Sequence, residues 1–178
     1  MVQINVSQQL KTSIGTTRDY DVNGIVDIEG GNCTVKGTVR LTRTDRSILA
    51  KGSIQTEIEL TCSRCLSPFN CPLTLTIEEE YFPTTDIYSG TPLPLPDEPG
   101  CFTIDEHNIL DLTEAIRQYA ILAIPMKPLC HQDCAGLCPT CGANLNLSSC
   151  NCPPSPTDPR WSRLKELVRT EPETPSKE

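Results

Sequence analysis

The 178-residue chain is long enough for one ordinary domain with a small appendage and too short for two full-sized domains. Aromatic residues make up only 4% of it, whereas 16 residues are proline and 10 are glycine, which favours short strands and turns over a large helical bundle. The formal net charge of −8 excludes a globally basic nucleic-acid-binding protein, so an RNA contact requires a local basic patch or a protein partner.

Eleven cysteines stand in a chain whose first residues do not resemble a secretory signal and which has no stretch long enough to span a membrane. We therefore expect a cytoplasmic protein, and the reducing cytosol favours metal binding over disulfides. Eight of the cysteines fall into metal-type pairs, whereas Cys33, Cys71 and Cys101 stand alone. Two four-thiolate sites, each holding a divalent ion, bring the net charge to about −12.

The first half of the chain is predicted to form strands. Alternating apolar residues are clearest over 54–60 and 73–77, where every second side chain belongs to one face. The runs 32–44 and 47–61 are separated by a plausible hairpin turn at 44–46, and residues 29–32 mark another turn after the run 20–28. These short connections predict an antiparallel meander.

Five prolines between Pro83 and Gly100 predict a mobile loop, because alternating prolines fit neither a helix nor a sheet interior. A helix should follow and end near Ala123, before Pro125. Asp111 is its expected N-cap, and Glu114 is expected to complete a capping box. Apolar residues cover a broad face of this helix, so we expect it to pack on the sheet; they are Leu112, Ala115, Ile116, Tyr119, Ile121 and Leu122.

The last quarter of the chain divides into three parts. Residues 129–152 hold a cysteine-rich element, and a proline-containing linker then leads to a short docking helix within 153–169. The charged tail from 170 to 178 is expected to be disordered. Residues 1–128 are therefore assigned to the β-rich domain with its packed helix.

The strongest local signal is Cys138-Pro-Thr-Cys141-Gly142 followed by Cys150-Asn-Cys152. Two thiolates separated by two residues can bind one metal ion from a tight turn whose backbone amides point at the sulfurs. Gly142 lies where such a turn requires a positive φ. Eight residues between Cys141 and Cys150 are enough to present the second pair.

A second site combines Cys62 and Cys65, on a turn between two strands, with Cys130 and Cys134 after the helix. A metal ion shared between segments so far apart in sequence removes much loop entropy from the unfolded chain. One alternative pairs Cys62 and Cys65 with the pair at 138 and 141. In another, His131 replaces a cysteine.

An all-thiolate tetrahedral shell favours Zn²⁺ over Mg²⁺ or Ca²⁺. Such a closed shell has no open position for water, so we expect two structural zinc ions and no enzyme activity. Neither a nucleophile arrangement around His107 or His131 nor a phosphate-binding glycine loop is evident. A redox dithiol is the competing interpretation of Cys-x-x-Cys, but that motif normally opens a helix in a βαβ unit.

Several of these motifs together resemble the YceD family of large ribosomal RNA subunit accumulation proteins. The resemblance covers most of the chain and is carried by Cys62-Ser-Arg-Cys65-Leu, Glu78-Glu-Glu-Tyr-Phe82, Leu122-Ala-Ile-Pro125, the string from Cys130 to Asn146, and Asp158-Pro-Arg-Trp161. It implies a role in the synthesis, processing or accumulation of 23S ribosomal RNA. Some members of that family keep the first Cys-x-x-Cys but lack the later cluster, which favours pairing Cys62 and Cys65 with the segment just after the helix.

The most basic local surface is the hairpin 40–51, with Arg64 on the neighbouring turn. Its residues Arg40, Arg43, Arg46 and Lys51, with Arg64, form the hypothesis for RNA contact. Simple solvation of exposed strands explains the same charges equally well.

The sequence as a whole predicts an α+β protein: an antiparallel sheet or partly open barrel, one packed helix and a C-terminal zinc-ribbon-like element. The expected function is a non-enzymatic zinc-binding factor for large-subunit ribosomal RNA, acting on the RNA or a pre-ribosomal particle directly or through a protein partner. No membrane or small-molecule substrate is expected. The alternative is an adaptor that binds protein through the proline-rich loop or the C-terminal helix and uses zinc only to keep its shape.

Overall fold

A computed structural model describes residues 1–96, 99–153 and 160. The chain divides into two units: the first holds Met1–Ser63 and Ser67–Gln132, and the second holds Arg64–Leu66 and the residues from Asp133 onward. The expected linker and docking helix within 153–169 fall almost entirely outside the described residues, and the expected disordered tail at 170–178 lies outside them altogether. Within the described residues, no helix is both long enough and apolar enough to cross a membrane.

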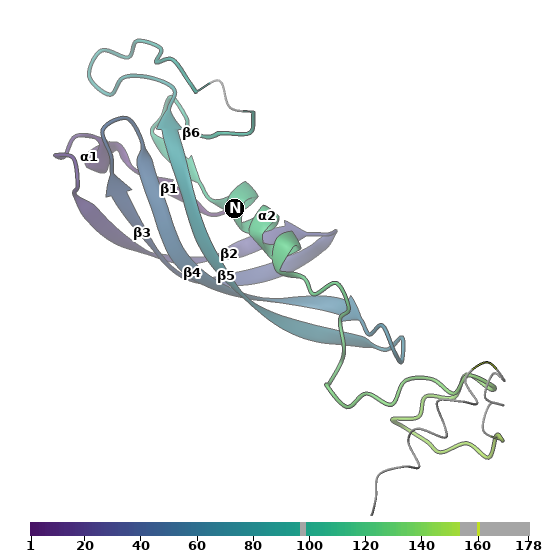
Figure 1. Ribbon diagram of the computed structural model, residues 1–178. Coiled ribbons are helices and arrows are strands. Elements are labelled where there is room, and N and C mark those ends of the chain that lie inside the picture. The colour runs from purple at the N-terminus through teal and green to yellow at the C-terminus, as the bar shows by residue number, and fades with distance from the viewer. Residues whose placement is uncertain (97–98, 154–159, 161–178) are drawn as a thin grey trace, which may run out of the picture. The chain divides into compact units, whose positions relative to one another are not determined.

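The first unit is built on a seven-stranded sheet with the strand order β1-β7-β6-β5-β4-β3-β2 (Figure 1). The elements in chain order are β1 (Gln3–Asn5), α1 (Ser7–Leu10), β2 (Thr17–Ile28), β3 (Gly31–Arg43), β4 (Ile48–Thr61), β5 (Pro68–Pro83), β6 (Phe102–Ile104), β7 (Ile109–Asp111) and α2 (Thr113–Ala123). Strands β2 to β5 form the antiparallel meander that the sequence predicts. The turns at 29–30 and 44–47 lie where expected.

The predicted alternation of buried and exposed residues is confirmed in the long strands. Ile54 and Ile58 of β4 are buried, and in β5 the buried residues are Leu73, Leu75 and Ile77. Thr56 is buried on the same face, whereas Gln55, Glu57, Thr74 and Thr76 are exposed. One face of the meander therefore forms the core of the unit.

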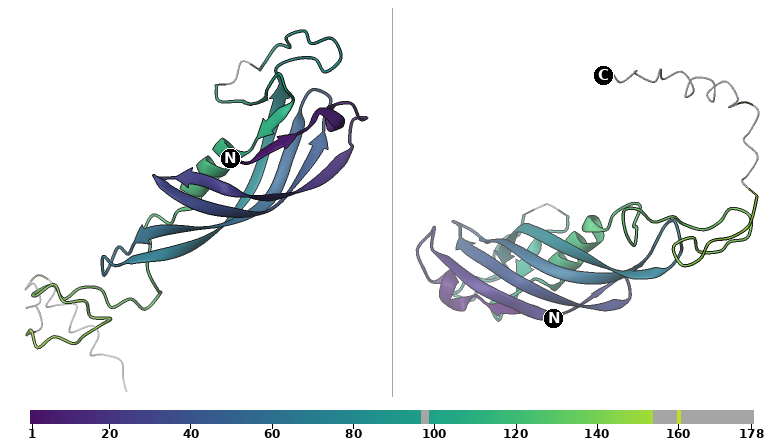
Figure 2. Two further views of the ribbon diagram at one scale, coloured as in Figure 1. Left: turned by 180° about the vertical axis from the view of Figure 1, so that it is seen from behind. Right: turned by 90° about the horizontal axis from the view of Figure 1, so that it is seen from below.

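Three glycines face this core from neighbouring strands and allow the sheet to curl. A Cβ at Gly37 would meet the carbonyl oxygen of Ser53, and one at Gly24 would lie 2.9 Å from a methyl group of Val2. A Cβ at Gly52 would lie 2.8 Å from the Cα of Val39. Backbones approach this closely only where strands bend, and Figure 2 shows the curl from two further directions.

The curl brings the two edges of the sheet toward each other, so the unit is a half-barrel. The amino group of Met1, beside β1, donates a 3.0 Å hydrogen bond to the carbonyl oxygen of Ile25 in β2. Helix α2 has neighbours in both β5 and β2. Ala115, Ile116 and Ala120 of α2 are fully buried in the same apolar cluster as the sheet residues.

The start of α2 differs from the prediction. The helix begins at Thr113 with Leu112 as N-cap, and no side chain caps it. Asp111 is the last residue of β7, where its carboxylate accepts hydrogen bonds from Gln3 and from the backbone N–H of Thr113. Because strand pairing holds Asp111 and because Glu114 binds the side chain of Arg117, the expected capping box does not form. The predicted end at Ala123 is confirmed.

The prediction of a wholly antiparallel sheet is wrong at one pairing, because β6 runs parallel to β5. The intervening proline-rich segment is long enough to cross over and return in the same direction. Leu122 also differs from expectation: it is 81% exposed although it was assigned to the apolar face of α2. Ile121 and Ile124 at the same end of α2 pack against the core, so Leu122 lies on the side of the helix that faces away from it.

The proline-rich segment has local structure of its own. Thr85 and Pro92 form an antiparallel bridge, and the carboxylate of Asp86 accepts hydrogen bonds from the backbone N–H groups of Tyr88 and Ser89. Both features close a turn over 86–91. The expected mobility of 83–100 stays a prediction.

Candidate metal centres

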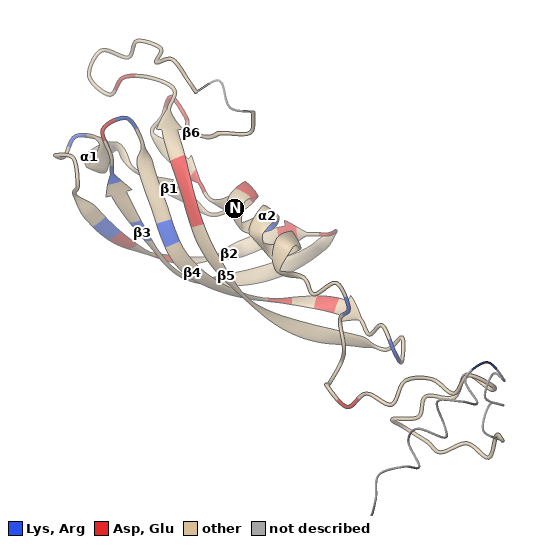
Figure 3. Cartoon of the chain, viewed as in Figure 1, with Lys and Arg blue, Asp and Glu red and all other residues tan. Residues whose placement is uncertain are grey.

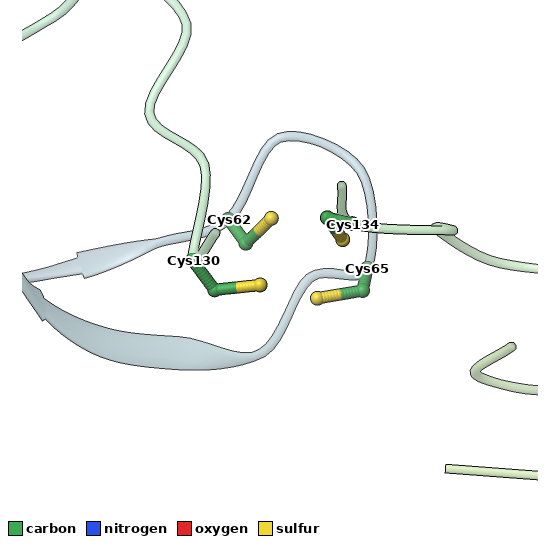
Figure 4. Close-up of side chains that lie close together, drawn as sticks. All are labelled: Cys62, Cys65, Cys130 and Cys134. Atoms are coloured by element: carbon green, nitrogen blue, oxygen red, sulfur yellow. The ribbon is translucent and has the colours of Figure 1, made fainter. Parts of the chain in front are cut away.

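The first candidate centre is a group of four cysteines whose sulfur atoms all lie within 4.8 Å of one another. Cys62 and Cys65 come from the turn between β4 and β5, and Cys130 and Cys134 come from the segment after α2. Figure 4 shows the four sulfurs turned toward a common point. Thiolates in a tetrahedral zinc site are about 3.8 Å apart, given a Zn–S bond of about 2.3 Å. The residues present therefore fit such an ion.

Local backbone geometry shapes the turn that carries the first two cysteines. The backbone N–H of Cys62 donates a 2.9 Å hydrogen bond to the carbonyl oxygen of Ser67 and closes the turn. Leu66 follows the second cysteine with φ of +57°, a conformation that costs energy for any residue with a Cβ. A backbone hydrogen bond of 2.8 Å from Ser63 to Pro128 fixes the turn against the chain leading to Cys130.

Arg64 holds the segment around Cys134. Its guanidinium donates a 2.9 Å hydrogen bond to the carbonyl oxygen of Cys134. Gly136, with φ of +76°, passes so close that a Cβ there would lie 3.3 Å from the carbonyl oxygen of Arg64. The side chain of Arg64 thus takes part in the architecture of the cysteine group.

The second candidate centre contains Cys138, Cys141, Cys150 and Cys152, whose sulfurs are likewise within 4.8 Å of one another. Its first turn repeats the closure of the other centre, because the N–H of Cys138 donates to the carbonyl oxygen of Ala143 at 2.8 Å. Gly142 has φ of +73°, as the motif predicts. Gly142 and Leu66 thus occupy equivalent places in the two turns.

The electrostatics of the second group show how a cation would be stabilised there. Backbone N–H groups of Cys141 and Thr140 lower the pKa of the Cys138 thiol to about 6. The pKa of Cys152 is raised to about 12, first by its contact with the Cys141 thiol and then by burial. One sulfur is therefore readily ionised while a neighbour resists a second negative charge. A divalent cation offsets that repulsion.

The two groups coincide with the two sets of four that we expected from the spacing, and they differ from the alternative that mixes the turns at 62–65 and 138–141. His131 belongs to neither group, although its Nδ1 lies 3.1 Å from the sulfur of Cys130. Cys33, Cys71 and Cys101 also lie outside both groups. Burial and the nearby Asp27 raise the pKa of the Cys33 thiol, which is part of the apolar core.

Two of the five basic residues predicted to contact RNA are paired with acidic residues on neighbouring strands. Arg40 of β3 binds Asp19 of β2 at 2.7 Å, and Lys51 of β4 binds Glu78 of β5 at 2.6 Å. In Figure 3 the basic positions of β3 and β4 lie between acidic positions of the flanking strands. The four residues are direct register partners, so one row across the outer face reads acid, base, base, acid.

The other three basic residues have separate surroundings. The guanidinium of Arg43 donates to the carbonyl oxygen of Ser47, and Arg46 lies 3.6 Å from Asp45 within the same turn. Arg64 lies in the cysteine-bearing turn. Of the five residues, only Arg40 and Lys51 therefore lie side by side, in the row across the outer face.

Sequence reasoning assigned no role to two residues beside the sulfurs. Leu66 carries the positive φ that glycine carries in the second turn, and Asn146 donates a hydrogen bond to the sulfur of Cys134. Aligning the two Cys-x-x-Cys turns would have pointed to Leu66. The asparagines between Cys141 and Cys150 were the available signal for Asn146, since asparagine commonly bonds backbone and side-chain groups in loops.

A curled half-barrel with two convergent four-cysteine groups defines this chain as a β-rich protein with candidate structural metal centres. Residues 50–168 match the model of the family described as large ribosomal RNA subunit accumulation protein YceD. The chain belongs to this family. The resemblance inferred from its motifs is thereby confirmed.

Relatives with curated sequences occur in bacteria and plants. The chain is 31% identical to an uncharacterized protein of Mycobacterium tuberculosis over 76% of its own length and 63% of the relative's. It is 34% identical to the chloroplastic large ribosomal RNA subunit accumulation protein YCED homolog 1 of Zea mays, over 66% of its own length and 48% of the relative's. The chain thus spans less than two thirds of these relatives. No solved structure matches it.

Proposed function

We propose that this protein is a non-enzymatic, cytoplasmic zinc-binding factor that supports the accumulation of 23S ribosomal RNA and the biogenesis of the large subunit. The observation that carries the proposal is the convergence of eight cysteines into two groups of four, in a chain that belongs to the YceD family. The family description names ribosomal RNA accumulation and no chemical reaction. A shell of four thiolates leaves no coordination position for a substrate or water.

In this proposal each group holds one Zn²⁺, and the segment with the second group is a zinc-ribbon-like element. Thiolate sulfur favours zinc over hard cations, and two Cys-x-x-Cys turns with aligned backbone amides are typical of structural zinc sites. When bound, the ion supplies no chemistry beyond cross-linking the chain and neutralising thiolates. The eight cysteines supply the ligands, and Arg64 and the backbone amides of the turns orient them.

Metal content per chain tests the zinc assignment. We expect two zinc ions in the purified protein and one in either the Cys62→Ser or the Cys138→Ser variant. Cys71→Ser is the matched control because Cys71 is partly buried but outside both groups, and it should retain both ions. A single ion in the parent protein would refute two separate four-cysteine sites.

The row containing Arg40 and Lys51 is the proposed RNA contact, with Arg43, Arg46 and Arg64 as further candidates. Exposed ion pairs contribute only about 0–1 kcal/mol each, so phosphate can compete for these cations. Neutral substitution is the appropriate test, because a glutamate at position 40 would face Asp19 and disturb the sheet. We expect Arg40→Gln to weaken binding to ribosomal RNA and Asp19→Asn to strengthen it at the same salt concentration. Equal affinity in both variants would remove this surface from the proposal.

The cellular role is tested by depletion and by co-purification. Loss of the protein should lower the amount of mature 23S relative to 16S ribosomal RNA, and the tagged protein should recover large-subunit precursor particles in an RNase-sensitive manner. Unchanged 23S levels would refute the proposed role.

A groove in the first unit supports the adaptor as a second candidate function. It has a volume of about 750 Å³ and is lined by Phe82 of β5, by Arg46 of the β3–β4 turn and by the partly exposed Leu93, Pro94 and Leu95. Its lining also contains charged residues of both signs, so such a groove suits an extended peptide with both apolar and charged side chains. A discrete RNase-resistant partner that is lost in a Leu93→Ser, Leu95→Ser double variant would favour this function over RNA contact.

A further inference from the structure

Asn146 belongs to the loop of the second cysteine group, but its side chain contacts a cysteine of the first. The loop runs from Cys141 to Cys150, and the Nδ2 of Asn146 lies 3.3 Å from the sulfur of Cys134. All residues of this contact lie within the second unit. An N–H donor aimed at a thiolate stabilises its negative charge and fixes its direction.

The hydrogen-bond partners of Asn146 determine which way its amide points. Its Oδ1 accepts a 2.8 Å hydrogen bond from the backbone N–H of Ala135, a role that an NH₂ group cannot take. The Nδ2 must therefore face Cys134. Its other hydrogen is donated to the Oδ1 of Asn144 at 2.8 Å, so both amide hydrogens are engaged.

The backbone of the second group holds Asn146 in this place. Leu145 donates its N–H to the carbonyl oxygen of Gly136 at 2.9 Å, and Leu137 and Asn144 form a bridge between the two segments. The loop ends at Cys150, whose sulfur meets those of Cys138 and Cys141. Gathering the second group therefore also folds the loop that presents Asn146.

We propose that Asn146 is a positioning residue for the first metal centre and that it couples the two centres, so that filling the second raises the metal affinity of the first. The inference rests on the proposed zinc binding. Removing an outer-shell hydrogen bond to a metal ligand typically lowers affinity by about 10–100-fold. Because coupling between binding sites is reciprocal, filling the first centre raises the affinity of the second by the same factor.

The test uses Co²⁺ as the metal probe on the full chain, with affinities measured against a competing chelator and thiolate-to-cobalt absorption bands recorded for each centre. Asn146→Asp keeps the acceptor for Ala135 but replaces the donor with a carboxylate oxygen beside the thiolate, and Asn146→Ala removes both groups. We expect each variant to weaken the first centre by about 10-fold or more and to shift its absorption band. Leu147→Ala is the control, because Leu147 is 84% exposed, and it should change neither centre.

A double-variant comparison tests the coupling itself. Cys138→Ser leaves only the first centre able to bind metal with four cysteines. The loop from Cys141 to Cys150, which presents Asn146, is then no longer fixed by a metal ion at the second centre. In that background, Asn146→Ala should have at most a small further effect on the first centre. Wild-type affinities and bands at both centres in the Asn146 variants would overturn the inference, as would a loss at the first centre that is as large in the Cys138→Ser background as in the parent protein. A parent protein that binds fewer than two Co²⁺ ions would instead overturn the proposed zinc sites.

Discussion

Gly37 provides a quantitative test of how the sheet curls. Its backbone lies in β3 opposite Ile54 of β4, and a Cβ there would lie 2.8 Å from the Cα of Ile54 and would also meet the carbonyl oxygen of Ser53. Both contacts are with backbone in a central strand, so no side-chain rotation can relieve them. The two strands must separate or the curl must flatten.

The expected cost of Gly37→Ala follows from these contacts. Forcing one extra carbon into a well-packed region typically costs about 1–3 kcal/mol, and the backbone contacts place this variant at about 3 kcal/mol or above. In a protein of this size, each kcal/mol lowers the midpoint of thermal unfolding by about 2–4 °C, which gives a decrease of about 6–12 °C. Circular dichroism of the metal-loaded full chain during heating measures it.

Gly31→Ala is the matched control for this prediction. Gly31 begins β3 on the exposed side of the turn, and a Cβ there would make only an ordinary contact of 3.5 Å with the carbonyl oxygen of Ile28. Alanine restricts the unfolded chain more than glycine, so this variant should be unchanged or stabilised by about 0.4–1 kcal/mol. If Gly37→Ala unfolded at the same temperature as Gly31→Ala, the close approach of β3 and β4 would not be the device that curls the sheet.

Three further predictions concern single side chains. Tyr81→Phe should leave stability unchanged or raise it by up to about 1 kcal/mol, because the buried hydroxyl has no hydrogen-bond partner in the described part of the chain; a clear loss in urea unfolding would contradict this. Leu66→Gly should raise the thermal midpoint of the loaded protein slightly, by relieving a positive φ at a side chain that is 63% exposed, whereas Leu66→Val should lower it. Arg117 and then Gln118 lower the pKa of Glu114 to about 2, so its contribution is present above about pH 4.5 and is lost as the pH falls toward 2. Glu114→Gln should therefore lower the urea midpoint at pH 6 but not at pH 2, and an equal effect at both would contradict the pairing.

The sequence predicts the long strands and the individual cysteine pairs because both depend on spacing along a few neighbouring residues. Spacing alone left open which pairs share a group, and the family resemblance favoured joining Cys62 and Cys65 with the segment after the helix. Over most of β4 and the middle of β5 every second residue is buried, and most of these residues are apolar, so the period is visible without knowing the partner strand. Strands β6 and β7 have three residues each, which is too short for a period to appear. The parallel pairing of β5 with β6 depends on where the intervening loop returns, which local patterns do not determine.

Contacts between residues far apart in sequence account for most of the remaining differences. The hairpin 40–51 is basic in the linear sequence because Asp19 and Glu78 lie 21 and 27 residues away from the cations with which they pair. Only strand register brings them together. Asp111 has the right neighbours for a helix cap, but its pairing with Gln3 in β1 keeps it in a strand.

Metal removal should affect the two units of the chain unequally. Residues 133–152 contain no helix or strand, and the only side chains buried there belong to Cys134 and Cys138. Without an apolar core, this segment depends on metal binding for its folding energy. The first unit has its own core of two dozen buried residues, none of which is a candidate metal ligand, so we expect it to stay folded after chelation.

Hydrogen exchange measured by mass spectrometry distinguishes the two responses. After chelation, the amides of Cys138, Gly142 and Leu145, which are hydrogen-bonded within the cysteine-rich segment, should lose their protection, while those of β3 and β4 keep theirs. The Cys138→Ser variant should show the same pattern around residues 138–152 before any chelator is added. Unchanged protection of Leu145 without metal would mean that loop contacts alone fold this segment. Loss of protection throughout β3 and β4 would mean that the metal ions support the sheet as well, because the turn at 62–65 lies directly between β4 and β5.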